Sequence, residues 1–210
     1  MQALECFESQ NYINKELVVS CLKQDQSTKG IIKVFQQNTN LNIQILEREP
    51  EDSACTAKYK AIQKCHGDYI CFWDDNNWHH SSRLSFQFNS IQRIGYGYKA
   101  SIMMRVFLYD HMTKLSYLSL NQPWDQTLLC KKEMILHNQI VNENRLIDMD
   151  VIALLESKKL LAHIDESPFL YIYSYHSNNP SIHHDFKHHI NISTLLSEEM
   201  SSKIRNILGD

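Results

Sequence analysis

Short apolar segments and amphipathic segments alternate through the first 75 residues, and this alternation restricts the chain to few folds. The apolar segments at 16–21, 42–46 and 68–73 have the length and composition of buried strands. The segments between them begin at two potential helix caps, Ser27 and Ser53, and carry apolar residues at helical spacing. Alternating strands and helices are typical of an α/β protein with a parallel, doubly wound sheet.

The pattern changes after residue 82. Helices are expected at 82–92, 148–161 and 193–208, and strands at 100–109, 115–120, 127–131 and 168–175. Asp110–Thr113 lies between two of these strands and has the composition of a turn. The prediction is an α/β fold whose mixed sheet has a parallel, doubly wound N-terminal half and an antiparallel C-terminal part.

Length and charge exclude several classes of protein. With 210 residues the chain suits one domain, and its net charge of −3 gives no basic surplus for nucleic acid. It has no apolar run of roughly 18 residues that could span a membrane, and its first residues lack the features of a signal peptide. Six cysteines without a Cys-x-x-Cys pair indicate core thiols in a reducing compartment. We therefore expect a cytoplasmic protein.

Acidic and amide side chains follow the third predicted strand in the run Trp73-Asp74-Asp75-Asn76. Ligands of open α/β sheets bind beyond the carboxyl ends of the strands. Carboxylates at such a place could hold a divalent cation against the phosphates of a nucleotide. The alternative is that Asp74 and Asp75 only end the strand and form the next turn, a common role of Asp.

Several segments together resemble the family 2 glycosyltransferases of bacteria, which have the GT-A fold. The similarity extends from residue 3 to about residue 186. The segments that carry it are Ala3–Val18, Gly67–Asp75, Trp78 with Arg83-Leu84, Thr127–Glu133, Asp148 and Pro168–His176. The resemblance predicts one GT-A-like domain at 1–190, lacking the family's first strand, followed by an amphipathic helix at 191–210.

This resemblance implies roles for individual residues. Asp74, Asp75, Lys58 and Trp73 would lie at the nucleotide-sugar donor, and Asp148 would be the general base that activates the acceptor hydroxyl. The expected cofactor is Mn or Mg, with Asp75, Asn76 and His176 as its ligands in this sequence. Trp73 is expected to form a wall of the pocket rather than to take part in the chemistry.

Departures from the family pattern all fall around the same pocket. Asn76 replaces the second metal-binding Asp and Ile147 replaces the Glu that precedes the base, while Cys21 and Leu22 replace the Asp residues that contact the nucleotide base. An amide offers a neutral oxygen, so metal binding is expected to be weak or absent. The chain also begins within the helix that follows the family's first strand.

Two functions are consistent with this pattern. The first is an inverting transferase that moves a sugar from a nucleotide-sugar donor to a hydroxyl of a surface glycan or lipid-linked acceptor. The second is a catalytically impaired GT-A domain that acts as a binding or assembly partner of an active transferase, or a gene fragment with no activity. A nucleotidyltransferase uses a similar sheet, but the match in the second half argues against it. A peripheral membrane or protein partner is compatible with either function.

Eleven histidines include His184 and His188 at a spacing that could place two imidazoles on one helical face. No Glu-x-x-His arrangement supports a site there, so a structural zinc site is not expected.

Overall fold

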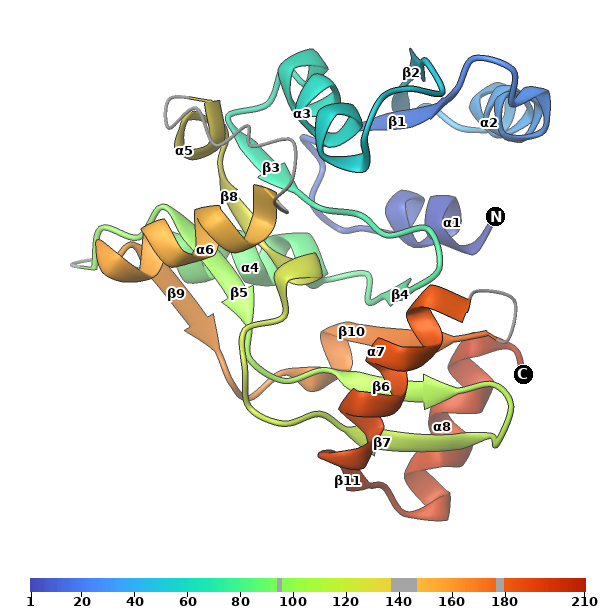
Figure 1. Cartoon of the computed structure of the whole chain (residues 1–210), viewed down its shortest axis with the longest axis vertical. Helices are drawn as coiled ribbons and strands as arrows, with labels where there is room; N and C mark the ends of the chain where they lie inside the picture. Colours follow the sequence, from blue (N-terminus) through green and yellow to red (C-terminus); the bar gives the residue numbers. More distant parts are fainter. Residues whose placement is uncertain (94–95, 137–146, 177–179) are drawn as a thin grey trace.

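The structure of the chain, a computed structural model, describes residues 1–93, 96–136, 147–176 and 180–210, without the side chains of 147–148 and 180–185 (Figure 1). Its described strands form sheets of two, four and five strands. Parallel and antiparallel pairs both occur, which confirms the predicted mixed α/β fold.

The N-terminal part has the predicted alternation of strands and helices. In chain order its elements are α1 (Gln2–Glu8), β1 (Glu16–Leu22), α2 (Gln26–Asn38), β2 (Asn42–Arg48), α3 (Ala54–Lys64) and β3 (Tyr69–Cys71). β1 and β2 pair in parallel, with Glu16 opposite Asn42 and Leu22 opposite Arg48. The predicted parallel crossover through α2 is therefore confirmed.

Side-chain caps determine where two of these helices begin. The Ser53 hydroxyl accepts a hydrogen bond from the Thr56 N–H at 3.0 Å, which confirms the predicted start of α3. Ser27 was the wrong cap for α2. The Asp25 carboxylate caps this helix by accepting the Thr28 N–H at 2.9 Å. A carboxylate is favoured there because it also interacts with the positive end of the helix dipole.

The four-stranded sheet forms the centre of the molecule, with the strand order β3, β8 (Leu129–Lys131), β5 (Ala100–Met103), β9 (Leu161–Ile164). β8 is antiparallel to both of its neighbours, and β5 and β9 are parallel. α3, α5 (Lys132–Leu136) and α6 (Ile147–Ser157) cover one face, with Ile102, Val151 and Leu155 buried between sheet and helices. α4 (Arg83–Ile91) covers the other face, where Leu84 and Ile91 cluster with Leu129.

The five-stranded sheet carries the C-terminal part, with the order β11 (Thr194–Leu195), β7 (Leu115–Leu118), β6 (Phe107–Asp110), β10 (Tyr171–Tyr175), β4 (Trp78–His79). α7 (Pro180–Asn191) covers one face, where Phe186 packs on Tyr173 and Tyr175. α8 (Glu198–Leu208) covers the other, with Ile204 against Tyr109 and Ile172. The two helices lie in front of and behind the sheet in Figure 1.

Some predicted boundaries were wrong. The strand expected at 100–109 is divided into β5 and β6, because the backbone at Met104 bonds to Ile164 and Gln122 while the chain passes from one sheet to the other. The helix expected at 148–161 ends at Ser157, and Leu161 begins β9. The helix expected at 193–208 begins only at Glu198, after β11.

The end of the chain is attached to the five-stranded sheet. The Asp210 carboxylate accepts a hydrogen bond from the Tyr109 hydroxyl at 2.7 Å and pairs with His111 at 2.9 Å. The division into a domain at 1–190 and a separate helix stays a prediction.

All six cysteines are free thiols, and Cys6, Cys21, Cys55 and Cys130 are buried, as predicted for core residues. Within the described ranges, no helix is both long and apolar enough to cross a bilayer.

Candidate functional site

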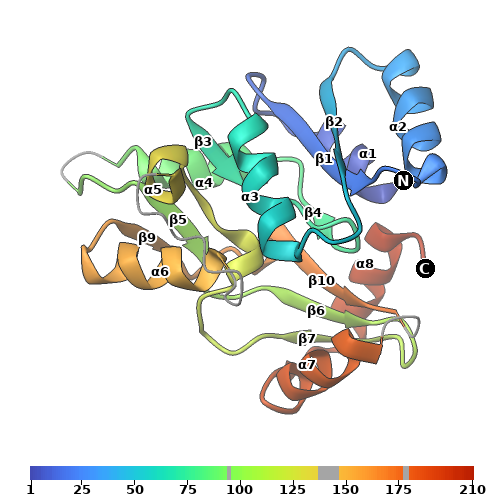
Figure 2. The same cartoon turned by 45° about the horizontal axis from the view of Figure 1, so that its top comes forward.

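A large cleft of about 1270 Å³ opens beside β3. Its walls come from α1, β1, α3, β3 and the segment that follows β3, seen together in the upper half of Figure 2. Four of the predicted site residues line it, namely Lys58, Trp73, Asp74 and Asp75. The structure therefore brings one side chain of α3 to the same cavity as the acidic run at the carboxyl end of β3.

The acidic run forms a compact turn. The Asp74 carboxylate accepts the Asn76 N–H at 2.8 Å, and the Asn76 side-chain amide donates to the Asp75 carboxylate at 3.0 Å. Asp75 and Asn76 are exposed, whereas Asp74 is half-buried. Asn76, which stands where the resemblance expects an acid, thus uses its amide group to hold Asp75. One oxygen of each carboxylate takes part in the turn, so the turn-forming and ligand-binding roles are compatible.

Burial raises the pKa of the Asp74 carboxyl, and the nearby Asp75 charge acts in the same direction. The Asn76 N–H, Lys58 and Arg83 oppose this rise in pKa. The environment thus disfavours the ionised form of Asp74, and any cation bound beside it would relieve that cost. A perturbed carboxyl in a cleft is a common property of functional sites.

Lys58 and Trp73 both line the cleft. The Lys58 ammonium lies 4.3 Å from the centroid of the Phe72 ring, a cation–π distance. The Trp73 indole N–H donates to the Ala3 carbonyl at 3.0 Å, and its ring is stacked on His79 with centroids 3.8 Å apart. These contacts support the predicted packing role of Trp73.

Arg83 lies behind the acidic run and is completely buried. Its guanidinium donates to the Gln87 side chain at 3.0 Å, to the backbone carbonyls of Phe72 at 3.3 Å and Gln126 at 3.4 Å, and to His79. These four partners are all uncharged. The Arg83 charge therefore acts on the surrounding groups, including Asp74, without forming an ion pair within 4.0 Å among the described residues.

His79 is held in one tautomer by its two neighbours. Since Arg83 donates to His79 Nδ1, the ring proton lies on Nε2, which donates to the Asp74 carbonyl at 3.2 Å. Burial, followed by the Arg83 charge, holds the pKa of His79 well below its usual range. The neutral ring connects the buried arginine to the backbone of the acidic run.

Further polar contacts hold this region to the five-stranded sheet. The Tyr171 hydroxyl donates to the Gln126 side chain at 2.8 Å, and the Asn77 side-chain carbonyl accepts the Ser174 N–H at 2.9 Å. Burial raises the pKa of Tyr171 well above its usual range, and the Asp74 charge adds to this rise. Tyr171 is thus a neutral hydrogen-bond donor.

The other predicted site residues lie elsewhere or outside the description. His176 follows β10, is exposed, and stacks on His111 with ring centroids 3.8 Å apart. Asp148 is the second residue of α6, and its side chain lies outside the described residues, as does that of His184. Among the side chains that the structure describes, no group of three or more His, Cys, Asp and Glu is placed to hold a metal ion. The proposed set of metal ligands and the base stay predictions.

Sequence reasoning assigned no role to Arg83, His79 or Gln87. A signal was present, because Arg83, Gln87 and Ser90 are polar residues spaced along one face of α4 and that face is buried. Polar residues at core-facing helical positions indicate a hydrogen-bonded network. Their link to the acidic run, however, depends on long-range contacts that no spacing reveals.

The sequence model of the family described as glycosyl transferase family 2 matches residues 2–153. Comparison with curated proteins gives no match.

Solved structures share the fold. Staphylococcus aureus TarS is similar with a TM-score of 0.58 at 13% identity, over 82% of this chain and 56% of that one. TarS in complex with UDP is similar with a TM-score of 0.58 at 14% identity, over 97% of this chain and 64% of that one. Mycobacterium tuberculosis glucosyl-3-phosphoglycerate synthase was solved with Mn²⁺, UDP-glucose and glycerol 3-phosphate. It is similar with a TM-score of 0.53 at 12% identity, over 88% of this chain and 69% of that one. The chain thus spans less than two thirds of the TarS structures.

Proposed function

We propose, from the premise that the chain belongs to glycosyl transferase family 2, that it transfers a sugar from a nucleotide-sugar donor to an acceptor hydroxyl. The observation that carries this proposal is the gathering of Asp74, Asp75 and Lys58 around one cleft at the carboxyl end of β3. A diphosphate needs positive charge and coordinated oxygens at its binding site, and these side chains can supply both, the carboxylates through a cation.

The donor class is inferred from the relatives. TarS binds UDP and the mycobacterial synthase binds UDP-glucose, in structures that share this fold. We infer a nucleoside diphosphate sugar as the ligand of the cleft. Trp73 and Lys58 would form its walls, and Lys58 would offset part of the diphosphate charge.

The residues present fit a hard divalent cation of limited affinity. Asp74 and Asp75 are adjacent carboxylates, and Mg²⁺ sites commonly use one or two carboxylates together with substrate phosphates. The Asn76 amide holds Asp75 in place and offers a neutral oxygen at most. When bound, Mn or Mg would neutralise charge on the departing diphosphate. His176 stays a further predicted ligand.

The reaction we propose is a displacement with inversion. The acceptor oxygen would form a bond to the anomeric carbon on the face opposite the diphosphate, and the bond from that carbon to the diphosphate would break. Asp148, by its match to the family, would take the proton of the acceptor hydroxyl. The proposed acceptor is a hydroxyl of a surface glycan or of a lipid-linked sugar. The proposed place of action is the cytoplasm. A peripheral membrane or protein partner is compatible with this location.

One observation favours the alternative of a catalytically impaired domain. Asn76 stands where the family pattern has an acid, so the acidic run has one negative charge fewer to hold a cation. A domain with such a pocket would retain the fold and act as a binding or assembly partner.

Nucleotide binding by the full chain distinguishes the two candidates. Isothermal titration with UDP, GDP and their glucose or mannose conjugates, with and without Mn²⁺, should show saturable binding that Mn²⁺ strengthens. Asp75→Asn should weaken the Mn²⁺-dependent part, because it removes a charged ligand. Asp165→Asn changes an exposed acid in a loop before η2 (Pro168–Leu170) and is the matched control.

A second pair tests the positive charge. Lys58→Ala should weaken nucleotide binding, whereas Lys64→Ala on the same helix should not, because Lys64 is exposed and does not line the cleft. Absence of binding by the folded chain at millimolar nucleotide would refute the transferase and leave the impaired domain.

A further inference from the structure

A glutamine that precedes β8 lines the cleft beside the acidic run. Gln126 belongs to η1 (Asp125–Thr127), and its side chain is half-buried. One nitrogen of the Arg83 guanidinium donates to the backbone carbonyls of both Phe72, at 3.3 Å, and Gln126, at 3.4 Å. Phe72 immediately precedes the acidic run. The shared arginine thus holds Gln126 next to the point where this run begins.

The neighbours of Gln126 determine how its side-chain amide is oriented. The Asn77 oxygen accepts the Ser174 N–H at 2.9 Å, so the Asn77 nitrogen is the end that faces Gln126, at 3.4 Å. The Tyr171 hydroxyl is completely buried, and its one hydrogen-bond partner among the described residues is the same atom of Gln126, at 2.8 Å. A buried hydroxyl proton needs an acceptor. Both neighbours therefore donate, and the Gln126 atom between them is the carbonyl oxygen.

The nitrogen of this amide remains for a ligand. It makes no hydrogen bond to any residue that the structure describes. The Gln126 oxygen is turned toward Asn77 and Tyr171, which are both buried, while the side chain as a whole lines the cleft. The nitrogen lies on the other branch of the same planar group, so it is turned away from these two residues. An amide nitrogen only donates, and it therefore complements an oxygen atom of the ligand.

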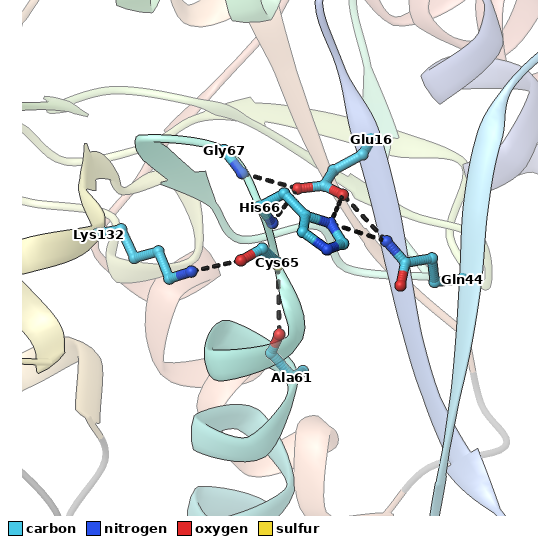
Figure 3. A network of polar contacts seen from close by, with 7 residues as sticks. All are labelled: Glu16, Gln44, Ala61, Cys65, His66, Gly67 and Lys132. Carbon is cyan, nitrogen blue, oxygen red and sulfur yellow. Dashed lines mark hydrogen bonds and ion pairs between the residues drawn. The ribbon is translucent and has the colours of Figure 1, made fainter.

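A second polar network lines the same cleft at the start of β3, and its carboxylate is fully used. Each oxygen of the Glu16 carboxylate has two partners (Figure 3). One accepts the N–H groups of His66 and Gly67, and the other accepts the Gln44 amide at 3.1 Å and lies 3.1 Å from the His66 ring. A carboxylate oxygen has two lone pairs, so Glu16 offers nothing further to a ligand. Of these two networks, the one around Gln126 is the one that presents an unused group.

The charge of the Gln126 amide distinguishes it from the other polar groups of the cleft. Asp74 and Asp75 can hold a diphosphate through a cation, and Lys58 carries a positive charge of its own. A neutral amide brings no charge to offset a phosphate, and hydrogen bonds that involve a charged group are the stronger ones. The hydroxyl oxygens of a sugar are neutral and need no such offset. The Gln126 nitrogen therefore suits the sugar better than the diphosphate.

The place of Gln126 agrees with this choice. β8 is the neighbour of β3 in the four-stranded sheet, whereas β1 belongs to the two-stranded sheet beyond β3 (Figure 1). In a nucleotide sugar the diphosphate joins the nucleoside to the sugar, so a diphosphate at the acidic run directs one of these two parts to Gln126. The sugar needs the more rigid contacts, because its anomeric carbon must be held in line for the displacement. A side chain that is fixed by buried neighbours supplies such a contact.

We propose that Gln126 binds the sugar of the donor, with its side-chain nitrogen donating a hydrogen bond to one sugar hydroxyl. Tyr171 and Asn77 are positioning residues, which hold the amide in this orientation. This inference rests on the proposed function. It makes Gln126 a determinant of donor specificity, because a sugar without a hydroxyl at that position would leave the amide nitrogen unpaired.

Binding of nucleotides with and without the sugar tests the proposal. The full chain is titrated in a calorimeter with UDP and UDP-glucose, and with GDP and GDP-mannose, in the presence of Mn²⁺. Gln126→Met keeps much of the length of the side chain but removes the amide nitrogen. It should lower the affinity for the nucleotide sugar about fivefold, the effect of one neutral hydrogen bond, and leave the affinity for the matching nucleoside diphosphate unchanged.

Two further variants separate a role in binding from a role in stability. Gln44→Met also removes a glutamine from a polar network, at the other end of β3, so it should lower the melting temperature without changing either affinity. Tyr171→Phe removes the hydroxyl that orients Gln126. It should weaken binding of the nucleotide sugar alone, and by less than Gln126→Met.

NMR supplies a second measurement on the unchanged protein. The side-chain N–H₂ signals of Gln126, assigned through bonds from its backbone, should shift when the nucleotide sugar binds and stay in place when the diphosphate alone binds. If Gln126→Met does not fold, this comparison decides.

Three results would overturn the proposal. Gln126→Met could change the affinities for nucleotide sugar and diphosphate equally, or change neither, which would refute the role of Gln126 and leave the transferase proposal intact. Side-chain signals that shift equally with the diphosphate alone would assign Gln126 to the nucleotide. Absence of binding of all four ligands would refute the transferase, and this inference with it.

Discussion

Replacing Arg83 by methionine should destabilise the protein and alter the titration of Asp74. Methionine keeps much of the length of the side chain but leaves four acceptors without their donor: the Gln87 side chain, His79, and the carbonyls of Phe72 and Gln126. All four surround a side chain that is completely buried. The change therefore removes hydrogen bonds that water cannot replace.

The expected decrease in the free energy of unfolding of Arg83→Met follows from these contacts. The bonds to Gln87 and His79 are well formed, and each bond from a charged donor contributes about 1.5–3 kcal/mol. The bonds to the carbonyls, at 3.3 and 3.4 Å, are long and contribute little. Methionine also removes the desolvation cost of the buried guanidinium, several kcal/mol in the absence of an ion pair. We expect a net loss of about 2 kcal/mol, or about 4–8 °C in melting temperature for a chain of this length.

Urea denaturation of the Arg83→Met, Arg83→Lys and Arg93→Met variants would measure this loss. Arg93 is exposed and lies two residues beyond the end of α4, so its replacement should change the free energy of unfolding by less than about 0.5 kcal/mol. Lysine keeps the charge but cannot reproduce the forked hydrogen bonds of arginine. The free energy of unfolding of Arg83→Lys should therefore lie between those of the unchanged protein and Arg83→Met.

The second readout is the carboxyl pKa of Asp74, measured by NMR titration. Arg83 now lowers this pKa against the effect of burial, so Arg83→Met should raise it further, and Arg83→Lys should raise it less. An Arg83→Met variant as stable as the Arg93→Met control, with the Asp74 titration unchanged, would refute the role given to the buried arginine.

Three further predictions concern stability. Asp74→Asn should raise the melting temperature at pH 7 by a few degrees, because the raised pKa of Asp74 means that its ionised form opposes folding. The gain in melting temperature should vanish below about pH 3.9, where the carboxyl is protonated in both the folded and the unfolded state. A lower melting temperature of the variant at pH 7 would contradict this reasoning. The free energy of unfolding should fall as the pH drops below about 6.5, because the folded state holds the pKa of His79 below that of the unfolded chain. His79→Gln should reduce the difference in the free energy of unfolding between pH 7 and pH 5.5, measured by urea denaturation. Ser53→Ala should cost about 1 kcal/mol through loss of the α3 cap, and an unchanged urea midpoint would exclude that cap.

Local signals in the sequence predicted the elements that local physics determines. β1, β2 and α3 were found with their order, because apolar runs and the Ser53 cap act within a few residues. The choice of Ser27 over Asp25 was wrong because two capping residues compete within one short stretch.

Long-range pairing determined what the sequence did not predict. The run from Ala100 to Tyr109 has the composition of one strand, and its division depends on partners at Ile164 and Gln122 far along the chain. The acidic run was identified from the sequence as a candidate site, but the buried Arg83 and His79 behind it were not. Whether a polar residue on a helix is buried depends on which surface packs against it, and that information lies outside the helix.

The passage of the chain from one sheet to the other has a consequence for unfolding. The segments 100–110 and 161–175 pair in parallel twice, as β5 with β9 in the four-stranded sheet and as β6 with β10 in the five-stranded sheet. Each segment thus contributes one strand to each of the two sheets, and the same two segments are neighbours in both. These two sheets should therefore open as one cooperative unit, with their slowest-exchanging amides sharing a common opening free energy.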